Sequence, residues 1–331
     1  MKPEREKLND ILPYGYLIVG LIILTLSADY LVRGAQNIAL RLNISPLVIG
    51  LTIVALGTSL PELIVSIRSA ILEVPGLAVG NIVGSNIANI MLIIGVGSII
   101  SPIPSINKGF IRDCLIMVGA TIIFTIMALF QLITAAMGLS LIVLLFIFLC
   151  SAYIEARKSG NGAINIIDVE ELDQKDITSL GTSTIWTILG LIGVAIGAEL
   201  LVDGGTSVAE NMGVSKEVIG LTMIAIGTSL PELATVIAAA VRRQSELIIG
   251  NVLGSNIFNL LGVIGCTAMI RELPISQEIL RLDIWIMLGV SILLPVFMYS
   301  KNQISRWEGG ILIISYIFYV ISQFNDSNLI L

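Results

Sequence analysis

The chain has 331 residues, of which 56% are hydrophobic and only 13% are charged. With a mean hydropathy of +0.97, this composition excludes an ordinary soluble domain and predicts an all-α integral membrane protein. The net charge of −6 and the lack of a basic patch give no support to nucleic-acid binding. No histidine is present, which removes the commonest metal ligand and the usual base of a nucleophilic hydrolase.

Ten apolar segments follow one another along the chain. Each is long enough to cross a hydrocarbon core of ~30 Å as a helix, which takes about 20 residues. They lie at residues 14–32, 45–71, 78–100, 112–131, 134–153, 184–203, 215–240, 246–270, 282–299 and 307–324. The first is too long for the apolar part of a signal peptide. The sequence therefore predicts ten transmembrane helices in a lipid bilayer, and we expect the plasma membrane.

The lysine and arginine residues predict the orientation of these helices. With the N-terminus outside, the inside loops hold eleven of them and the outside segments hold seven. Because cytoplasmic loops carry an excess of positive charge, both termini are predicted to lie outside. The polar segment at residues 154–183 then becomes a cytoplasmic linker.

Two motifs occur twice, each time 170 residues apart. The first is Gly57-Thr58-Ser59-Leu60-Pro61-Glu62, repeated as Gly227-Thr228-Ser229-Leu230-Pro231-Glu232. The second is Gly80-Asn81-x-x-Gly84-Ser85-Asn86-Ile87-x-Asn89, repeated as Gly250-Asn251-x-x-Gly254-Ser255-Asn256-Ile257-x-Asn259. The chain thus divides into halves at 1–153 and 184–331, with five predicted spans each. Since five is odd, the second half enters the membrane the other way up, and an inverted repeat of this kind places a binding site near the midplane.

The first motif predicts a polar break in the middle of a span. A carboxylate such as Glu62 or Glu232 costs at least roughly 2.5–3.5 kcal/mol there, so it is a functional-site hypothesis by default. Proline removes a backbone donor, and Gly57 lets the helix open. Opening frees carbonyl oxygens that can line a cavity or bind an ion. The expected carbonyls are those near Ala55, Thr58, Ala225 and Thr228.

The second motif predicts a closely packed helix that offers further oxygens. Gly80 and Gly84 lie one turn apart, which allows backbone contact, and tight packing alone is the competing explanation for the glycines. Ser85 and Asn89 share a face. The inventory is all oxygen, which suits hard cations such as Na⁺, Ca²⁺, Mg²⁺ or Mn²⁺. Asp29 and Glu199 also differ by 170 and are either interfacial contacts or part of a permeation path.

The doubled motifs closely resemble the α-repeats of the cation/calcium exchanger superfamily, and in particular its prokaryotic sodium/calcium exchangers. The resemblance covers essentially the whole chain. It implies ten transmembrane helices around a diamond of sites that alternately hold several Na⁺ or one Ca²⁺. These ions are transported, no organic cofactor is expected, and the protein is not an enzyme. We expect it to function as a monomer.

The resemblance also implies a role for individual residues. Glu62 and Glu232 are the carboxylates shared by Ca²⁺ and Na⁺, and Thr58 and Thr228 give backbone carbonyls to Ca²⁺. One flanking Na⁺ site is lined by Ser59, Ser85 and the Ala55 carbonyl, the other by Ser229, Ser255 and the Ala225 carbonyl. Asn89 and Asn259 flank the central position. The first and sixth helices slide against the remaining core to switch access.

One departure from the family pattern separates the possible ions. Some members carry aspartate at the position of Asn259, which is associated with K⁺ dependence in one branch and with a protonatable site in others. Asn86 and Asn89 stand where the proton-coupled branch has a further glutamate. We therefore predict a secondary antiporter that exchanges Na⁺ for Ca²⁺ by alternating access. The alternatives are Ca²⁺/H⁺ or K⁺-dependent Na⁺/Ca²⁺ exchange and, less expected, a cation channel.

Overall fold

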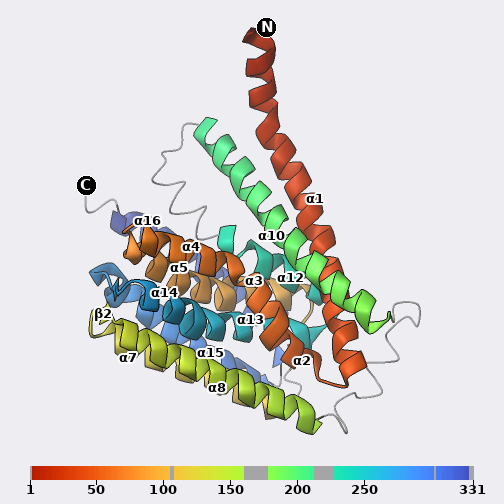
Figure 1. Cartoon of the computed structure of the whole chain (residues 1–331), viewed down its shortest axis with the longest axis vertical. Helices are drawn as coiled ribbons and strands as arrows, with labels where there is room; N and C mark the ends of the chain where they lie inside the picture. Colours follow the sequence, from red (N-terminus) through yellow and green to blue (C-terminus); the bar gives the residue numbers. More distant parts are fainter. Residues whose placement is uncertain (1, 105–107, 160–177, 212–226, 302, 328–331) are drawn as a thin grey trace.

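The computed structural model describes residues 2–104, 108–159, 178–211, 227–301 and 303–327, and they are almost entirely helical (Figure 1). Before the linker the elements are α1 (Lys2–Leu42), α2 (Pro46–Ile49), η1 (Gly50–Val54), α3 (Ala55–Thr58), α4 (Leu60–Ile71), α5 (Pro75–Ala88), η2 (Asn89–Ile93), α6 (Ile94–Ile100), β1 (Ile103–Pro104), α7 (Lys108–Ala128), β2 (Leu132–Ile133) and α8 (Ala135–Ser159). After it come α10 (Leu180–Asn211), α12 (Leu230–Val241), α13 (Ser245–Ile257), η4 (Phe258–Val263), α14 (Ile264–Ile270), β3 (Leu273–Pro274), η5 (Ile279–Asp283), α15 (Ile284–Lys301), β4 (Gln303–Ile304) and α16 (Arg306–Ser327).

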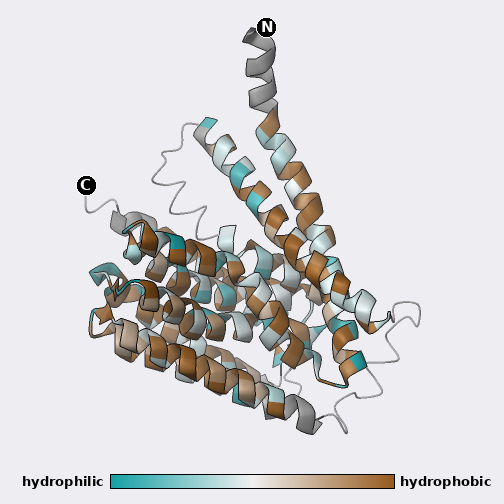
Figure 2. Ribbon diagram, viewed as in Figure 1, coloured by the Kyte–Doolittle hydropathy of each residue, from teal (hydrophilic) through white to brown (hydrophobic). Residues whose placement is uncertain are grey.

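The helices have the length and surface of membrane spans. Within the described residues seven are long and apolar enough to cross a bilayer, and the bent pair Pro46–Thr58 and Leu60–Ile71 adds an eighth if it is one span. Hydrophobic residues continue along α7 and α8 (Figure 2), where large apolar side chains such as Phe146 and Leu115 are exposed. Many polar side chains, by contrast, are buried. A hydrophobic surface around a polar interior identifies an all-helical membrane protein.

The helix boundaries differ from the predicted spans mainly in the first and sixth helices. α1 covers Lys2–Leu42 against a predicted 14–32, and α10 covers Leu180–Asn211 against a predicted 184–203. Hydrophobicity marks only the part of a helix that meets lipid, whereas in α1 good helix formers such as Glu, Lys and Arg continue the helix beyond that part. Residues 215–226 of the predicted span 215–240, together with most of the linker, lie outside the described residues.

The break predicted in the first motif is present. The helices on its two sides are bent by 42°, and Ser59 lies between α3 and α4 with φ −84° and ψ 4°. Ser229 has nearly the same conformation before α12, with φ −89° and ψ 0°. Both prolines are thus accommodated in the first turn of a new helix, where a backbone N–H is not needed.

α1 and α10 form a closely packed pair that runs obliquely to the other helices (Figure 1). A Cβ atom added at Gly197 would lie 2.6 Å from the backbone nitrogen of Leu24, and one at Gly190 would lie 2.7 Å from that of Leu31. Small residues therefore let the two backbones touch, as is common between helices in membranes.

Two short antiparallel ladders join segments from before and after the linker. β1 pairs with β4, with Ile103 opposite Ile304, and β2 pairs with β3, with Ile133 opposite Leu273. Each ladder therefore ties a loop of residues 1–153 to a loop of residues 184–331. Because α7 runs from β1 to β2, the two ladders join the two parts of the chain at opposite ends of the bundle.

The α1–α10 contact yields a stability prediction. Gly197→Ala should lower the melting temperature of the purified protein, because the new methyl group meets backbone that no rotamer change can move, and overpacking costs ~1–3 kcal/mol. The matched control is Gly119→Ala in α7, where a Cβ meets no other described atom within 4 Å. Equal melting temperatures for the two variants in detergent would contradict the close contact.

Candidate cation site

The two motif glutamates begin the helices that follow the breaks. Glu62 lies in the first turn of α4 and Glu232 in the first turn of α12, and both side chains are fully buried. The N-terminus of a helix carries partial positive charge, which favours a carboxylate in its first turn. The break therefore explains how the chain can place an acid in its interior at all.

Hydroxyl groups from both halves surround these carboxylates. Ser85 Oγ donates to Glu62 Oε1 at 3.2 Å, and Ser59 Oγ donates to Glu232 Oε1 at 3.3 Å. Ser229 Oγ in turn donates to Ser85 Oγ at 3.2 Å. The carboxylate of the second half thus binds the first half's serine. The predicted serines of the two halves are brought into one cluster.

Four buried oxygens of this cluster have no donor among the described residues. Glu62 Oε2 and Glu232 Oε2 are buried and have no hydrogen-bond partner among the described residues. The same holds for Asn89 Oδ1 and Asn259 Oδ1. These four atoms form two pairs separated by 170 residues in the sequence. A buried acceptor without a donor is costly, so such a set is suited to binding a positive ligand.

The threonines of the first motif have matched partners in the opposite half. Thr58 Oγ1 donates to Asn251 Oδ1 at 3.1 Å, and Thr228 Oγ1 donates to Asn81 Oδ1 at 3.2 Å. Ser255, also predicted, lies 3.4 Å from Thr58 through the two hydroxyls. A close glycine contact with backbone also crosses between the halves, since a Cβ at Gly250 would lie 2.5 Å from the carbonyl oxygen of Leu47.

One predicted carbonyl is not freed by the break. The Ala55 oxygen accepts the backbone N–H of Ser59 at 3.0 Å and the Thr58 hydroxyl at 3.4 Å. Ser59 still has a near-helical backbone, so its bond to Ala55 survives. Pro61, which lacks an N–H, instead leaves the carbonyl of Gly57 without its helical donor. Ala225 lies outside the described residues.

Several residues of the cluster are missing from the predicted set. They are the asparagines Asn81, Asn251, Asn86 and Asn256, all buried and all hydrogen-bonded across the two halves. Their presence at the same position in both motif copies was a usable signal. The π-helical segments η2 and η4, which begin at Asn89 and next to Asn259, had no such signal. π-bulges are frequent at functional sites.

Asp29 forms an ion cluster with two arginines. Its carboxylate lies 2.5 Å from Arg242 Nη2 at the end of α12 and 3.0 Å from Arg33 Nε. All three side chains are partly exposed. The contact ties α1 to α12 and does not involve the buried oxygens. The role of Glu199 stays a prediction.

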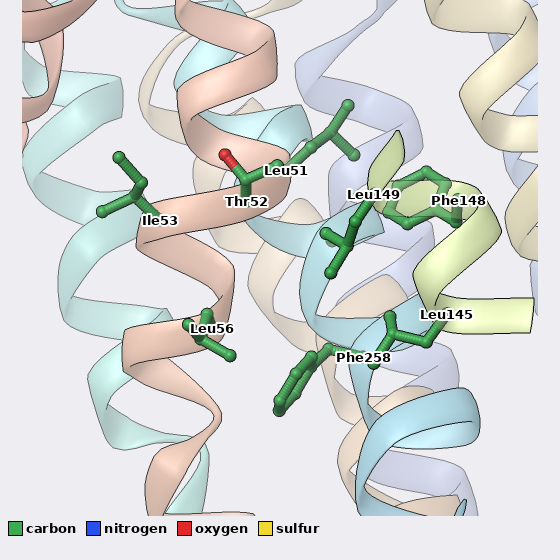
Figure 3. Close-up of a pocket in the computed structure, with 9 residues that line it drawn as sticks. Leu51, Thr52, Ile53, Leu56, Leu145, Phe148, Leu149 and Phe258 are labelled. Atoms are coloured by element: carbon green, nitrogen blue, oxygen red, sulfur yellow. The ribbon is translucent and has the colours of Figure 1, made fainter. Parts of the chain in front are cut away.

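A separate cavity of about 140 Å³ lies beside the cluster and is apolar (Figure 3). Leu145, Phe148 and Leu149 of α8 line it together with Leu51 and other residues of η1, α3, α13 and η4. Its one hydroxyl, that of Thr52, donates to the Val48 carbonyl at 2.6 Å. The cavity therefore offers nothing to a cation.

The chemistry of the buried cluster suits a hard cation. Its ligands are carboxylate, amide, hydroxyl and carbonyl oxygens, which Na⁺ and Ca²⁺ prefer. Among the described residues, no three or more His, Cys, Asp or Glu side chains lie together in a group that could hold a metal ion. The negative charge comes from Glu62 and Glu232 alone. Two carboxylates balance one Ca²⁺ or two Na⁺.

Comparison with known proteins adds the family. The family model described as sodium/calcium exchanger protein matches residues 12–154 and 182–325. An uncharacterized membrane protein of Methanocaldococcus jannaschii is 37% identical over 94% of this chain and 98% of its own length. The sodium/calcium exchanger MaX1 of Methanosarcina acetivorans is 31% identical over 93% and 97%. The structure of the sodium–calcium exchanger NCX_Mj soaked with Na⁺ and Ca²⁺ matches with a TM-score of 0.81, 34% identity and coverage of 94% and 98%.

The unpaired carboxylate oxygens yield a prediction for ligand-dependent stability. Glu62→Gln and Glu232→Gln should each raise the melting temperature without cations, because a buried charge is removed, and should weaken the stabilisation by Ca²⁺. The free energy of unfolding of the wild-type protein should rise by ~2.7 kcal/mol at a Ca²⁺ concentration of 100 times the dissociation constant. Glu73→Gln, an exposed acid paired with Arg271, is the control. A full Ca²⁺ response in both buried variants would refute the site.

Proposed function

This chain belongs to the sodium/calcium exchanger family, whose members are transporters and not enzymes, and we propose that it is an antiporter that exchanges Na⁺ for Ca²⁺. The observation that carries the proposal is the set of four buried oxygens without donors, two from glutamates and two from asparagines. Their number and charge suit one Ca²⁺ or a small group of Na⁺ ions. The relatives that bear these ions in their names support the same assignment.

We assign the ligands by combining this set with the motif residues. Glu62 and Glu232 bind both ions, and Asn89 and Asn259 flank the central position through their Oδ1 atoms. The Ca²⁺ ligands further include the backbone carbonyls of Thr58 and Thr228. The flanking Na⁺ positions use Ser59, Ser85 and the Ala55 carbonyl on one side, and Ser229, Ser255 and the Ala225 carbonyl on the other. For Ala55 this requires the Thr58 hydroxyl, which lies 3.4 Å from the Ala55 carbonyl, to donate to Asn251 alone.

We also propose ten transmembrane helices in two inverted five-helix halves, at 1–153 and 184–331, with a cytoplasmic linker at 154–183. Support comes from loops predicted on the same side, which contact each other. β1 pairs with β4 on the predicted inside, and β2 pairs with β3 on the predicted outside. Arg271 and Glu73, both predicted outside, form an ion pair of 3.1 Å. Both termini then lie outside a plasma membrane.

The mechanism follows from the charge of the site. Uncompensated carboxylates in a low dielectric are expensive, so only a core neutralised by its cations crosses between inward- and outward-facing states. The α1–α10 pair, which runs obliquely to the other helices, is the element that slides. One chain contains both halves of the site, and we propose that it functions as a monomer.

The proposal favours Na⁺ as the only coupling ion. Asn259 Nδ2 donates to Ser85 Oγ at 3.3 Å and to Asn86 Oδ1 at 3.0 Å. An amide held in this way adds a neutral oxygen and no third acid. A K⁺-dependent or proton-coupled exchanger is therefore not proposed.

The decisive test is transport in proteoliposomes. Vesicles loaded with Na⁺ and diluted into Na⁺-free buffer should take up radiolabelled Ca²⁺, and Glu62→Gln or Glu232→Gln should reduce this uptake to background. Vesicles loaded with K⁺, or given only a proton gradient, are the matched controls, and Glu73→Gln is the control variant. Uptake driven by the proton gradient alone would overturn the Na⁺ assignment, and native uptake by both glutamine variants would overturn the site.

A further inference from the structure

Two asparagines pair reciprocally between the halves of the chain. Asn86 Nδ2 donates to the backbone oxygen of Asn256 at 3.3 Å, and Asn256 Nδ2 donates to the backbone oxygen of Asn86 at 3.4 Å. Both side chains are buried. The two residues lie 170 positions apart in the sequence, so each half donates one of these hydrogen bonds to the other half and accepts the equivalent one.

We propose that Asn86 and Asn256 are positioning residues that decide which atom Asn259 and Asn89 present to the cation. The proposal rests on the proposed function, because it assumes that the cluster binds the transported ions. Neither Asn86 nor Asn256 needs to touch the ion. Each acts through the amide beside it.

The hydrogen bonds that run from the Asn256 carbonyl through Asn86 to Asn259 are called the relay here. Because the relay begins at a backbone carbonyl, the donor and the acceptor of each bond in it are fixed. A backbone carbonyl can only accept, so the atom of Asn86 that faces the Asn256 carbonyl must be Nδ2. Oδ1 of Asn86 is then left to face Asn259. Two oxygens cannot hydrogen-bond, so Asn259 must turn its Nδ2 toward Asn86, at 3.0 Å. Its own Oδ1 is thereby directed elsewhere.

The second relay repeats the first with the halves exchanged. The Asn86 carbonyl fixes Nδ2 of Asn256, and Oδ1 of Asn256 accepts from Asn89 Nδ2 at 2.9 Å. The outcome is the same, since Asn89 Oδ1 is also buried and without a donor among the described residues. Both end members therefore present oxygen. Flipping either amide would set its NH₂ group toward the cation and two oxygens against each other.

The relay also selects the residue type at its end. A carboxylate at position 259 would have no N–H for the Asn86 oxygen and would meet it as a second acceptor at about the same distance. The two fixed carbonyls thus favour a neutral amide at both ends. This keeps the charge of the site at that of its two glutamates.

The test is a double-mutant cycle on the full-length protein, with Ca²⁺ as the probe. Asn86→Ala should raise the Ca²⁺ dissociation constant about tenfold. The substitution removes the hydrogen bond that holds Asn259 Nδ2 away from the ion, and one such bond is worth roughly 1 kcal/mol net. Asn259→Asp alone should also weaken binding, since its carboxylate meets Asn86 Oδ1. Combined with Asn86→Ala, it should bind more tightly than either single variant, because the opposing oxygen is gone.

Asn37→Ala is the matched control for a merely structural role. Asn37 is a buried asparagine of α1 that donates to the Arg33 carbonyl at 3.0 Å. Its loss should lower the melting temperature and leave the Ca²⁺ dissociation constant and its competition by Na⁺ unchanged. If Asn86→Ala does not fold, Asn256→Ala tests the same relay at Asn89.

Failure of the relay is distinguishable from failure of the transport function. Unchanged Ca²⁺ affinity in Asn86→Ala, or strictly additive effects in the cycle, would overturn the relay even where Glu62→Gln abolishes exchange. Native exchange by the glutamine variants would overturn the function on which the relay rests. Non-additive changes of the Ca²⁺ dissociation constant, with the predicted sign, support the relay and the binding site on which it rests.

Discussion

The structure depends on two buried carboxylates that have no positively charged partner among the described residues. Oε1 of Glu62 and Oε1 of Glu232 each accept a serine hydroxyl, whereas Oε2 of each has no hydrogen-bond partner among the described residues. Hydroxyl bonds of 3.2 and 3.3 Å do not compensate two buried charges. The broken helices, the polar interior and the bonds between the halves are all consistent with our proposal that a cation neutralises these acids.

The doubling of the motif gives the cluster its geometry. Most of its bonds join a residue of one half to a residue of the other, as between Thr58 and Asn251 or Thr228 and Asn81. A site built across two halves can open on one side as it closes on the other when the halves move. The ion pair between Asp29 and Arg242 has no equivalent at the 170-residue offset, because Leu72 stands where the matching arginine would be.

Much of this arrangement could be predicted from the sequence, because its signals are local. Pro61 predicted the break, the 170-residue offset predicted the paired acids, and apolar length predicted most helices. The partners across the halves could not be predicted, since no local pattern says that Ser59 binds Glu232 while Ser85 binds Glu62. The surviving bond to the Ala55 carbonyl and the π-helical turns at Asn89 and Asn259 depend on tertiary packing. The extra length of α1 depends on polar residues that hydropathy ignores.

A structure determined with bound Ca²⁺ tests the central claim most directly. The account predicts anomalous density for one ion at about 2.3–2.6 Å from oxygens of both Glu62 and Glu232, with Asn89 and Asn259 turning their Oδ1 atoms toward the site. Density at another acid, such as Asp113, with the two glutamates unchanged, would contradict it.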